Sequence, residues 1–249
     1  MKRFLYLALL TTAPAWGQSV DSTAVTPFPQ KSNFRSGFMF ELGYGFAITR
    51  FANMNAFFRD NQAEFNKKMD RFFVAGMGYR RQRFKVTLHT LLMISQNLLP
   101  PNQTGSTLVA RPKDMSGLDI FLGYDIANGR NRRFFLNAGV GSFRYEYSLF
   151  RATNQPVAFQ DILRYTPPGT VSSLYLTTDY WNVNLEMAQR EKRKETLQLV
   201  GRVGYRRSFR PRAWQSDAYQ LTNAPLDRIS QFYFQLGIYL SRNKQKSPQ

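Results

Sequence analysis

The segment from Gly37 to Thr49 carries the clearest structural pattern in the chain. It contains, in order, Phe38-Met39-Phe40-Glu41-Leu42-Gly43-Tyr44-Gly45-Phe46-Ala47-Ile48. Every even position is large and apolar, whereas the odd positions are small or polar except for Met39. This period of two predicts a β-strand with one apolar face. Transmembrane strands of about 9–11 residues have this pattern, because bulky side chains face lipid and small ones face a narrow barrel interior.

Further segments show the same alternation. They span residues 73–80, 84–94, 118–124, 134–150, 174–187, 197–206 and 232–240. The connections between them are alternately long and short, beginning with a long one. Membrane barrels have short periplasmic turns and long extracellular loops. The sequence therefore predicts an all-β fold: an eight-stranded antiparallel transmembrane up-and-down β-barrel with short periplasmic turns and long extracellular loops. A soluble β-sandwich is the alternative.

The N-terminus has the pattern of a secretory signal peptide. Lys2 and Arg3 precede a short apolar run, and the small residues Ala15 and Gly17 indicate cleavage near Gly17. We expect a signal peptide over 1–17, a flexible periplasmic segment over 18–36, the barrel over 37–242 and a basic tail over 243–249. An exported chain with transmembrane strands is expected in the outer membrane of a Gram-negative bacterium.

Composition excludes several kinds of site. The chain has no cysteine, which excludes a disulfide framework, a thiolate metal site and a lipoprotein anchor. Its formal net charge of +18 suggests nucleic acid in an intracellular protein, but the export signal argues against that partner. With a single histidine, a metal site would need oxygen ligands, and no cluster of Asp and Glu indicates one. We expect no metal and no cofactor.

Glycine–tyrosine pairs recur along the predicted strands. They stand at Gly43-Tyr44, Gly78-Tyr79, Gly123-Tyr124 and Gly204-Tyr205. With the signal peptide, this pattern resembles the PorT-like and OmpA-like outer-membrane barrel domains, particularly those of Bacteroidota. The last strand, from Gln235 to Leu240, resembles the signal that the barrel-assembly machinery reads, although a terminal aromatic residue is missing. The resemblance implies a small barrel that this machinery inserts.

The interior of an eight-stranded barrel is just wide enough for its own side chains. We expect the inward polar residues to form a plug of ion pairs and hydrogen bonds, because buried charges persist where they are paired. Its charged and titratable members are Glu41, Lys85, His89, Asp119, Glu186 and Arg202. A gated pore for small solutes is the alternative. His89 would be the base in a lipid-modifying barrel enzyme, but no serine motif accompanies it, so we assign no catalytic residue.

The long loops carry further candidate residues. An apolar stripe of Phe51, Met54, Phe58, Phe65 and Met69 predicts a helix, broken near Asn61, that caps the barrel mouth, lies at the membrane interface or binds a partner. Contacts with lipopolysaccharide phosphates or a partner are expected for Arg206, Arg207, Arg210 and Arg212. Four tyrosines suit an adhesive hairpin that projects from the membrane: Tyr145, Tyr147, Tyr175 and Tyr180.

These features favour a non-enzymatic outer-membrane barrel with a closed lumen that serves as a structural, adhesive or complex-forming component. Expected partners are outer-membrane lipid and lipopolysaccharide, the assembly machinery, and a periplasmic or outer-membrane protein that contacts the basic short turns. The alternatives are a small-solute channel, a subunit of a secretion or transport assembly, and a lipid-modifying enzyme.

Overall fold

The computed structural model describes residues 36–65, 69–93, 108–127, 132–151, 171–190 and 195–243. The expected signal peptide, most of the segment that follows it and residues 244–249 of the expected tail lie outside this part. No helix among the described residues is long and apolar enough to cross a membrane.

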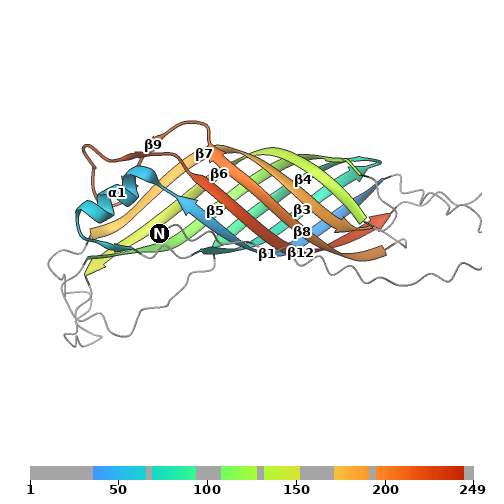
Figure 1. The fold of residues 1–249 in the computed structure, drawn as a ribbon, viewed down its shortest axis with the longest axis horizontal. Coiled ribbons are helices and arrows are strands. Elements are labelled where there is room, and N and C mark those ends of the chain that lie inside the picture. Colours follow the sequence, from blue (N-terminus) through green and yellow to red (C-terminus); the bar gives the residue numbers. More distant parts are fainter. Residues whose placement is uncertain are drawn as a thin grey trace, which may run out of the picture. The chain divides into compact units, whose positions relative to one another are not determined.

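Eight long antiparallel strands close into a barrel (Figure 1). They are β1 (Ser36–Arg50), β3 (Asp70–Arg81), β4 (Phe84–Met93), β5 (Leu108–Asp125), β6 (Arg132–Arg151), β7 (Val171–Gln189), β8 (Glu195–Ser208) and β12 (Ser230–Asn243). Each of these strands pairs with the one before it, and β12 also pairs with β1, which completes the ring. The predicted up-and-down barrel is confirmed.

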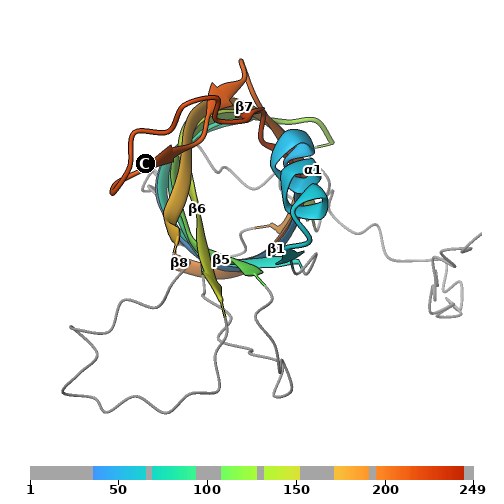
Figure 2. The same cartoon turned by 90° about the vertical axis from the view of Figure 1, so that its left-hand side faces the viewer.

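The remaining elements lie at the end of the barrel where β1 ends, which we call the long-loop end. They are α1 (Ala52–Asp60), β2 (Glu64–Phe65), β9 (Arg212–Ala213), β10 (Gln215–Ser216) and β11 (Leu226–Asp227). β2 pairs with β5, β10 with β7, and β9 with β11. Figure 2 looks along the barrel from this end and shows α1 beside the ring of strands. The opposite end carries the short turns, and we call it the short-turn end.

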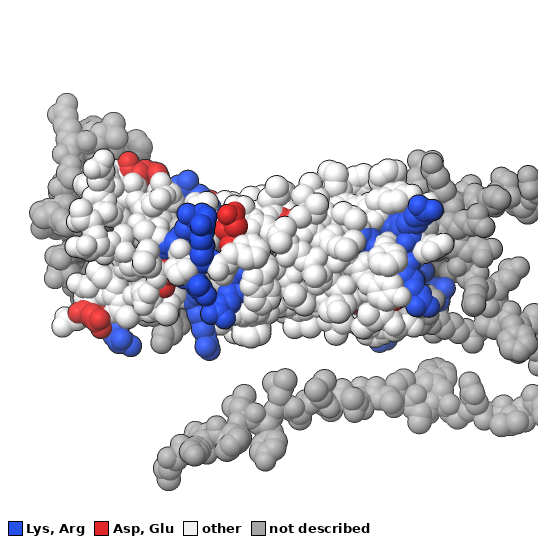
Figure 3. All heavy atoms as spheres, turned by 90° about the horizontal axis from the view of Figure 1, so that it is seen from above, with Lys and Arg blue, Asp and Glu red and all other residues white. Residues whose placement is uncertain are grey.

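The outer surface of the barrel is apolar. On β1, Phe38 and Phe40 are exposed while Met39 and Glu41 between them are buried, as the pleat of a strand requires. The other strands expose Met77, Leu122, Leu136, Leu199, Val203, Phe234 and Leu236. On the face drawn in Figure 3, Lys and Arg side chains gather in two belts separated by a broad surface without them. An apolar band between charged belts is the surface of a barrel that spans a membrane.

β5 extends farther toward the long-loop end than the alternation predicts, whereas β6 and β7 are long, as expected. β5 begins at Leu108, whereas the alternating segment in the sequence begins at residue 118. The pairing of β5 with β6 shifts its register between Pro112 and Asp114. Such a bulge lets a strand accommodate a residue that has no backbone N–H to donate. β5, β6 and β7 therefore form a wall that continues past the ends of β1 and β8.

Glycines on the inner face make room for large side chains in the narrow lumen. A Cβ atom on Gly45 would lie 2.3 Å from Cζ of Phe72, and one on Gly76 would lie 2.3 Å from Cδ2 of His89. Both glycines therefore let a ring from a neighbouring strand cross the lumen directly over the backbone. The small residues on one face of the first strand, which predicted the barrel, are thus the residues that allow it to be filled.

Candidate functional site

The centre of the lumen holds an arginine between two carboxylates. Arg202 on β8 donates from Nη1 and Nη2 to the Glu41 carboxylate on β1, over 2.5 and 2.8 Å, and from Nε to Glu186 on β7, over 2.7 Å. All three residues are at most 3% exposed. The paired donors of a guanidinium match both oxygens of a carboxylate, so this arrangement is geometrically specific as well as charged.

Other strands complete the network around this arginine. The Lys85 ammonium on β4 lies 2.5 Å from Glu186, which also accepts from the amide of Asn137 at 3.2 Å. Gln235 on β12 donates to Glu41 over 2.7 Å, and Nε2 of His89 lies 3.0 Å from the same carboxylate. Tyr239 contacts both cations through its hydroxyl. Side chains from opposite walls are therefore joined across the lumen.

A second layer lies above this network, toward the long-loop end, and is centred on Arg206. Its guanidinium carbon lies between 4.9 and 5.7 Å from the ring centroids of Phe72, Phe143, Tyr180 and Tyr233. Its Nε donates to Gln231, and its Nη1 lies 4.0 Å from Asp119. Aromatic faces attract a desolvated cation through their quadrupoles, so the rings stabilise a charge whose nearest carboxylate is at the limit of an ion pair.

The position of Arg206 corrects the sequence analysis, which grouped it with outward arginines at the start of a loop. It is 1% exposed and lies inside the barrel. The physical reason is that β8 continues to Ser208, and its inward positions alternate through Arg202, Gly204 and Arg206. Arg207, Arg210 and Arg212 are exposed, and their contact with lipopolysaccharide or a partner stays a prediction.

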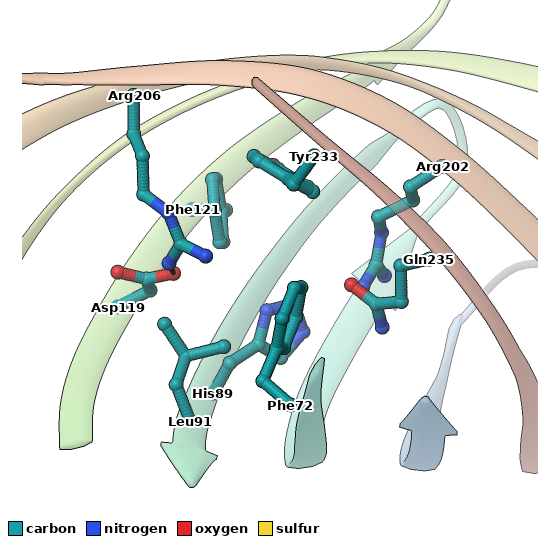
Figure 4. Close-up of a pocket in the computed structure, with 9 residues that line it drawn as sticks. All are labelled: Phe72, His89, Leu91, Asp119, Phe121, Arg202, Arg206, Tyr233 and Gln235. Atoms are coloured by element: carbon teal, nitrogen blue, oxygen red, sulfur yellow. Dashed lines mark ion pairs between the residues drawn. The ribbon is translucent and has the colours of Figure 1, made fainter. Parts of the chain in front are cut away.

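The two layers leave almost no space between them. Figure 4 shows the residues around a cavity there, with Arg206 directed toward Asp119. The lining residues are Phe72, His89, Leu91, Asp119, Phe121, Arg202, Arg206, Tyr233 and Gln235. The cavity measures about 10 Å³, which is about the volume of one water-sized sphere. All six charged or titratable residues predicted for the lumen are thus buried in these two layers.

Aromatic side chains fill the long-loop end above Arg206. Phe51, just before α1, packs its ring 4.9 Å from that of Tyr145 and 5.2 Å from that of Trp214. Phe58 on α1 lies 5.3 Å from Tyr147. The expected adhesive tyrosines are therefore mostly unavailable on the surface, because Tyr145, Tyr147 and Tyr180 point into the barrel and are buried. Tyr175 lies on the outer side, partly covered by Arg144.

The predicted apolar stripe is only partly helical. Phe51, Met54 and Phe58 are buried against the barrel, and α1 ends at Asp60, close to the expected break. Phe65 belongs to β2, and Met69 is exposed outside the helix. After Asn61 the chain pairs as β2 with β5. The apolar residues beyond the helix therefore do not form a second helical segment, although their spacing resembles one. The buried part of the stripe packs on the aromatic side chains at the long-loop end.

Asp227, which the sequence analysis did not single out, holds α1 in place. Its carboxylate accepts from the backbone N–H groups of Asn53 and Met54, each over 2.8 Å, and from Nε1 of Trp214 over 2.9 Å. The first N–H groups of a helix need acceptors from outside it. Phe51 occupies the N-cap position and makes no side-chain cap. A phenylalanine at this position has no side-chain oxygen to accept from the helix, which indicates that another segment must supply the acceptor.

His89 lies within the ion network of the lumen. Its polar contact there is with Glu41, and its ring lies 5.2 Å from that of Phe121. Among the described residues, no group of His, Asp and Glu side chains is arranged to hold a metal ion. The local chemistry is therefore that of a packed ion network.

The fold resembles that of solved β-barrels, whereas no family model and no curated protein sequence matches the chain. Neisserial surface protein A is 9% identical with a TM-score of 0.49, covering 82% of this chain and 96% of its own. Ail, the attachment invasion locus protein of Yersinia pestis, is 10% identical with a TM-score of 0.42, covering 83% and 99%. The outer membrane protease OmpT of Escherichia coli is 8% identical with a TM-score of 0.35, covering 88% and 99%. These likenesses concern the fold alone and indicate neither a ligand nor a reaction.

Proposed function

We propose that the chain is a non-enzymatic barrel of the outer membrane of a Gram-negative bacterium, with a closed lumen, acting as a structural, adhesive or complex-forming component. The observation that carries the closed lumen is Arg202, whose guanidinium joins Glu41 and Glu186 across the interior. The apolar exterior between basic belts supports the membrane location. In the proposed orientation, the short-turn end faces the periplasm and the long-loop end faces the cell exterior.

Planar-bilayer recording tests the closed lumen. The purified full-length protein is inserted at low protein concentration in 1 M salt, beside a porin of known conductance as a positive control. We expect no resolved single-channel steps, because the described lumen admits only about one water between its layers. Regular steps of a fixed size from the wild-type protein would overturn the closed lumen and favour a small-solute channel.

The complex-forming role needs a separate test. Outer membranes are crosslinked and solubilised at low salt, where contacts of the basic rim are least screened. A partner recovered in fixed stoichiometry, and lost on replacing exposed Arg81 and Arg83 at the short-turn end, would support a complex subunit. Recovery of the monomer alone would favour a stand-alone structural or adhesive barrel.

The finer resemblance to PorT-like barrels of Bacteroidota, and with it a role in a secretion or transport assembly, rests on the sequence pattern. The proposal that the barrel-assembly machinery inserts the chain rests on the sequence of the last strand, from Gln235 to Leu240. The lipid-modifying alternative depends on His89: if His89→Ala removed a hydrolase or transferase activity while the barrel stayed folded, the non-enzymatic proposal would be wrong.

A further inference from the structure

Two arginines flank a serine on the outer face of the barrel, near its long-loop end. Arg50 on β1 lies opposite Ser230 on β12, which in turn lies opposite Arg207 on β8. Residues directly opposite in a sheet project to the same side. Strands are about 4.8 Å apart, so the Cα atoms of the arginines are about 10 Å apart. Both side chains are long enough to converge above Ser230.

The charges of this pair are not compensated within the described structure. Arg50 and Arg207 are both exposed, and no described carboxylate lies within ion-pair distance of either guanidinium. Asp179 on the neighbouring strand β7 is also exposed on the outer face of the barrel, but no ion pair joins it to Arg207. Arg144, also on the outer side, differs because it reaches Asp217 at 3.5 Å and stacks on Tyr175 at 4.0 Å. Within the described structure, both guanidinium groups are therefore available to an external acceptor.

Ser230 is held between the arginines as a further donor. Its Oγ lies 2.8 Å from the hydroxyl of Tyr205, which projects from β8 on the same face. If the Tyr205 hydroxyl donates this bond, the serine proton is free to donate to another acceptor. Two guanidinium groups and one hydroxyl are then donors on the same face of three adjacent strands, and a tetrahedral oxyanion could accept from all three.

The site lies at the boundary of the apolar band. One row nearer the middle of the barrel, Ile48 lies opposite Phe232, and Phe232 lies opposite Tyr205. Trp181 stands beside Arg207 in the row of the arginines. Tyrosine and tryptophan are characteristic of the headgroup level of a bilayer. A ligand bound here would place its charged group on the arginines and its apolar part on Ile48 and Phe232.

We propose that Arg50, Ser230 and Arg207 form a site for the phosphate group of an outer-leaflet phosphorylated lipid. The guanidinium groups donate charge-assisted hydrogen bonds to the phosphate oxygens, and the acyl chains lie along the apolar surface below. This assigns the lipid contact to a row across β1, β12 and β8, in place of the loop arginines beginning at Arg206. The inference rests on the proposed membrane location and is independent of whether the lumen is closed.

Lipid titration of the full-length protein in a neutral detergent tests the site, with bound lipid counted by native mass spectrometry. The probes are diphosphorylated lipid A and the same lipid without phosphates. We expect the dephosphorylated lipid to bind at least tenfold more weakly. The double variant Arg50→Gln/Arg207→Gln should weaken binding of the phosphorylated lipid at least tenfold, and Ser230→Ala should weaken it severalfold.

The matched control is Arg81→Gln/Arg83→Gln, which removes the same charge from exposed positions at the short-turn end. Its affinity should stay within twofold of the wild type, and heat-dependent gel migration verifies that every variant is folded. An equal loss in the control would show a general effect of charge and overturn the site. Displacement of the lipid by millimolar inorganic phosphate would assign the site to free phosphate instead. A conducting lumen with intact lipid binding would refute only the closed-lumen proposal.

Discussion

At the scale of single residues, two buried arginines on one strand are stabilised in different ways. Arg202 is bound by the carboxylates of Glu41 and Glu186, whereas Arg206 is enclosed by aromatic rings and approaches Asp119 at 4.0 Å. The strand supplies both cations at the same face, and the neighbouring strands decide which acceptors each one meets. Removal of each arginine should therefore have different consequences.

Arg202→Ala should destabilise the barrel strongly. It leaves Glu41 and Glu186 buried without their shared cation, and breaking a buried ion network in this way costs about 3–5 kcal/mol. Urea unfolding in phospholipid vesicles, followed by tryptophan fluorescence, measures the change. The control is Arg210→Ala, at an exposed position just past the end of the same strand, which should stay within about 0.5 kcal/mol. Similar losses for both variants would contradict the network as the main stabilising element of the lumen.

At the scale of elements, α1 depends on a distant loop for its N-terminal cap. Asp227 at the end of β11 bonds to Asn53, Met54 and Trp214, so one carboxylate joins the first long loop to the last. The helix has nine residues, and helices this short are marginal without tertiary support. α1 is therefore held at the long-loop end by a few polar contacts and by the packing of Phe51, Met54 and Phe58.

Asp227→Ala should loosen α1 while the barrel remains folded. The loss of a helix cap typically costs about 0.5–2 kcal/mol, and this carboxylate also bonds to Trp214. Hydrogen exchange over residues 52–60 should become faster, and exchange in β12 below the loop should be unchanged. Asp60→Ala provides the control, because Asp60 is exposed and its ion pair with Arg59, at 3.5 Å, lies on the surface. Unchanged exchange in α1 of the Asp227 variant would show that apolar packing alone holds the helix.

At the scale of the whole molecule, the barrel inverts the arrangement of a soluble protein. Its lumen holds ion pairs and its outer surface holds the large apolar side chains, so the exterior needs an apolar solvent. The belts of Lys and Arg seen in Figure 3 mark where that solvent ends. The depth of an outward-facing residue between the two belts should therefore determine how much a charged substitution there lowers the free energy of unfolding.

Charge substitutions along β1 test this arrangement. Leu42 lies near the middle of the strand and Phe38 near its short-turn end, and both face outward. An arginine on the lipid face costs about 2–4 kcal/mol at the bilayer midplane and about 0–1 kcal/mol near the interface. We expect Leu42→Arg to destabilise the barrel more than Phe38→Arg by this difference when both are unfolded from vesicles. Equal costs would mean that the apolar band is not centred in the bilayer.

Much of this molecule was predictable because the relevant information is local. The period of two on β1, with bulk at Phe40 and Leu42 and glycine at Gly43, reports which face is outside without knowledge of any partner strand. The alternation of loop lengths then orders the strands. For the same reason the inward placement of Glu41, Lys85 and Glu186 followed from their own strands alone.

What the sequence alone determined is therefore the barrel, the number of its strands and the inward placement of the charged residues at the centre of the lumen. Only the tertiary structure decided that Arg206 is inside, that Asp227 caps α1, and that Arg50 and Arg207 flank Ser230. The physical reason is that these three arrangements depend on where strands end and on the register between segments far apart in the chain. A repeating pattern within one strand reports its face, but carries no information about the residue that its neighbour places opposite.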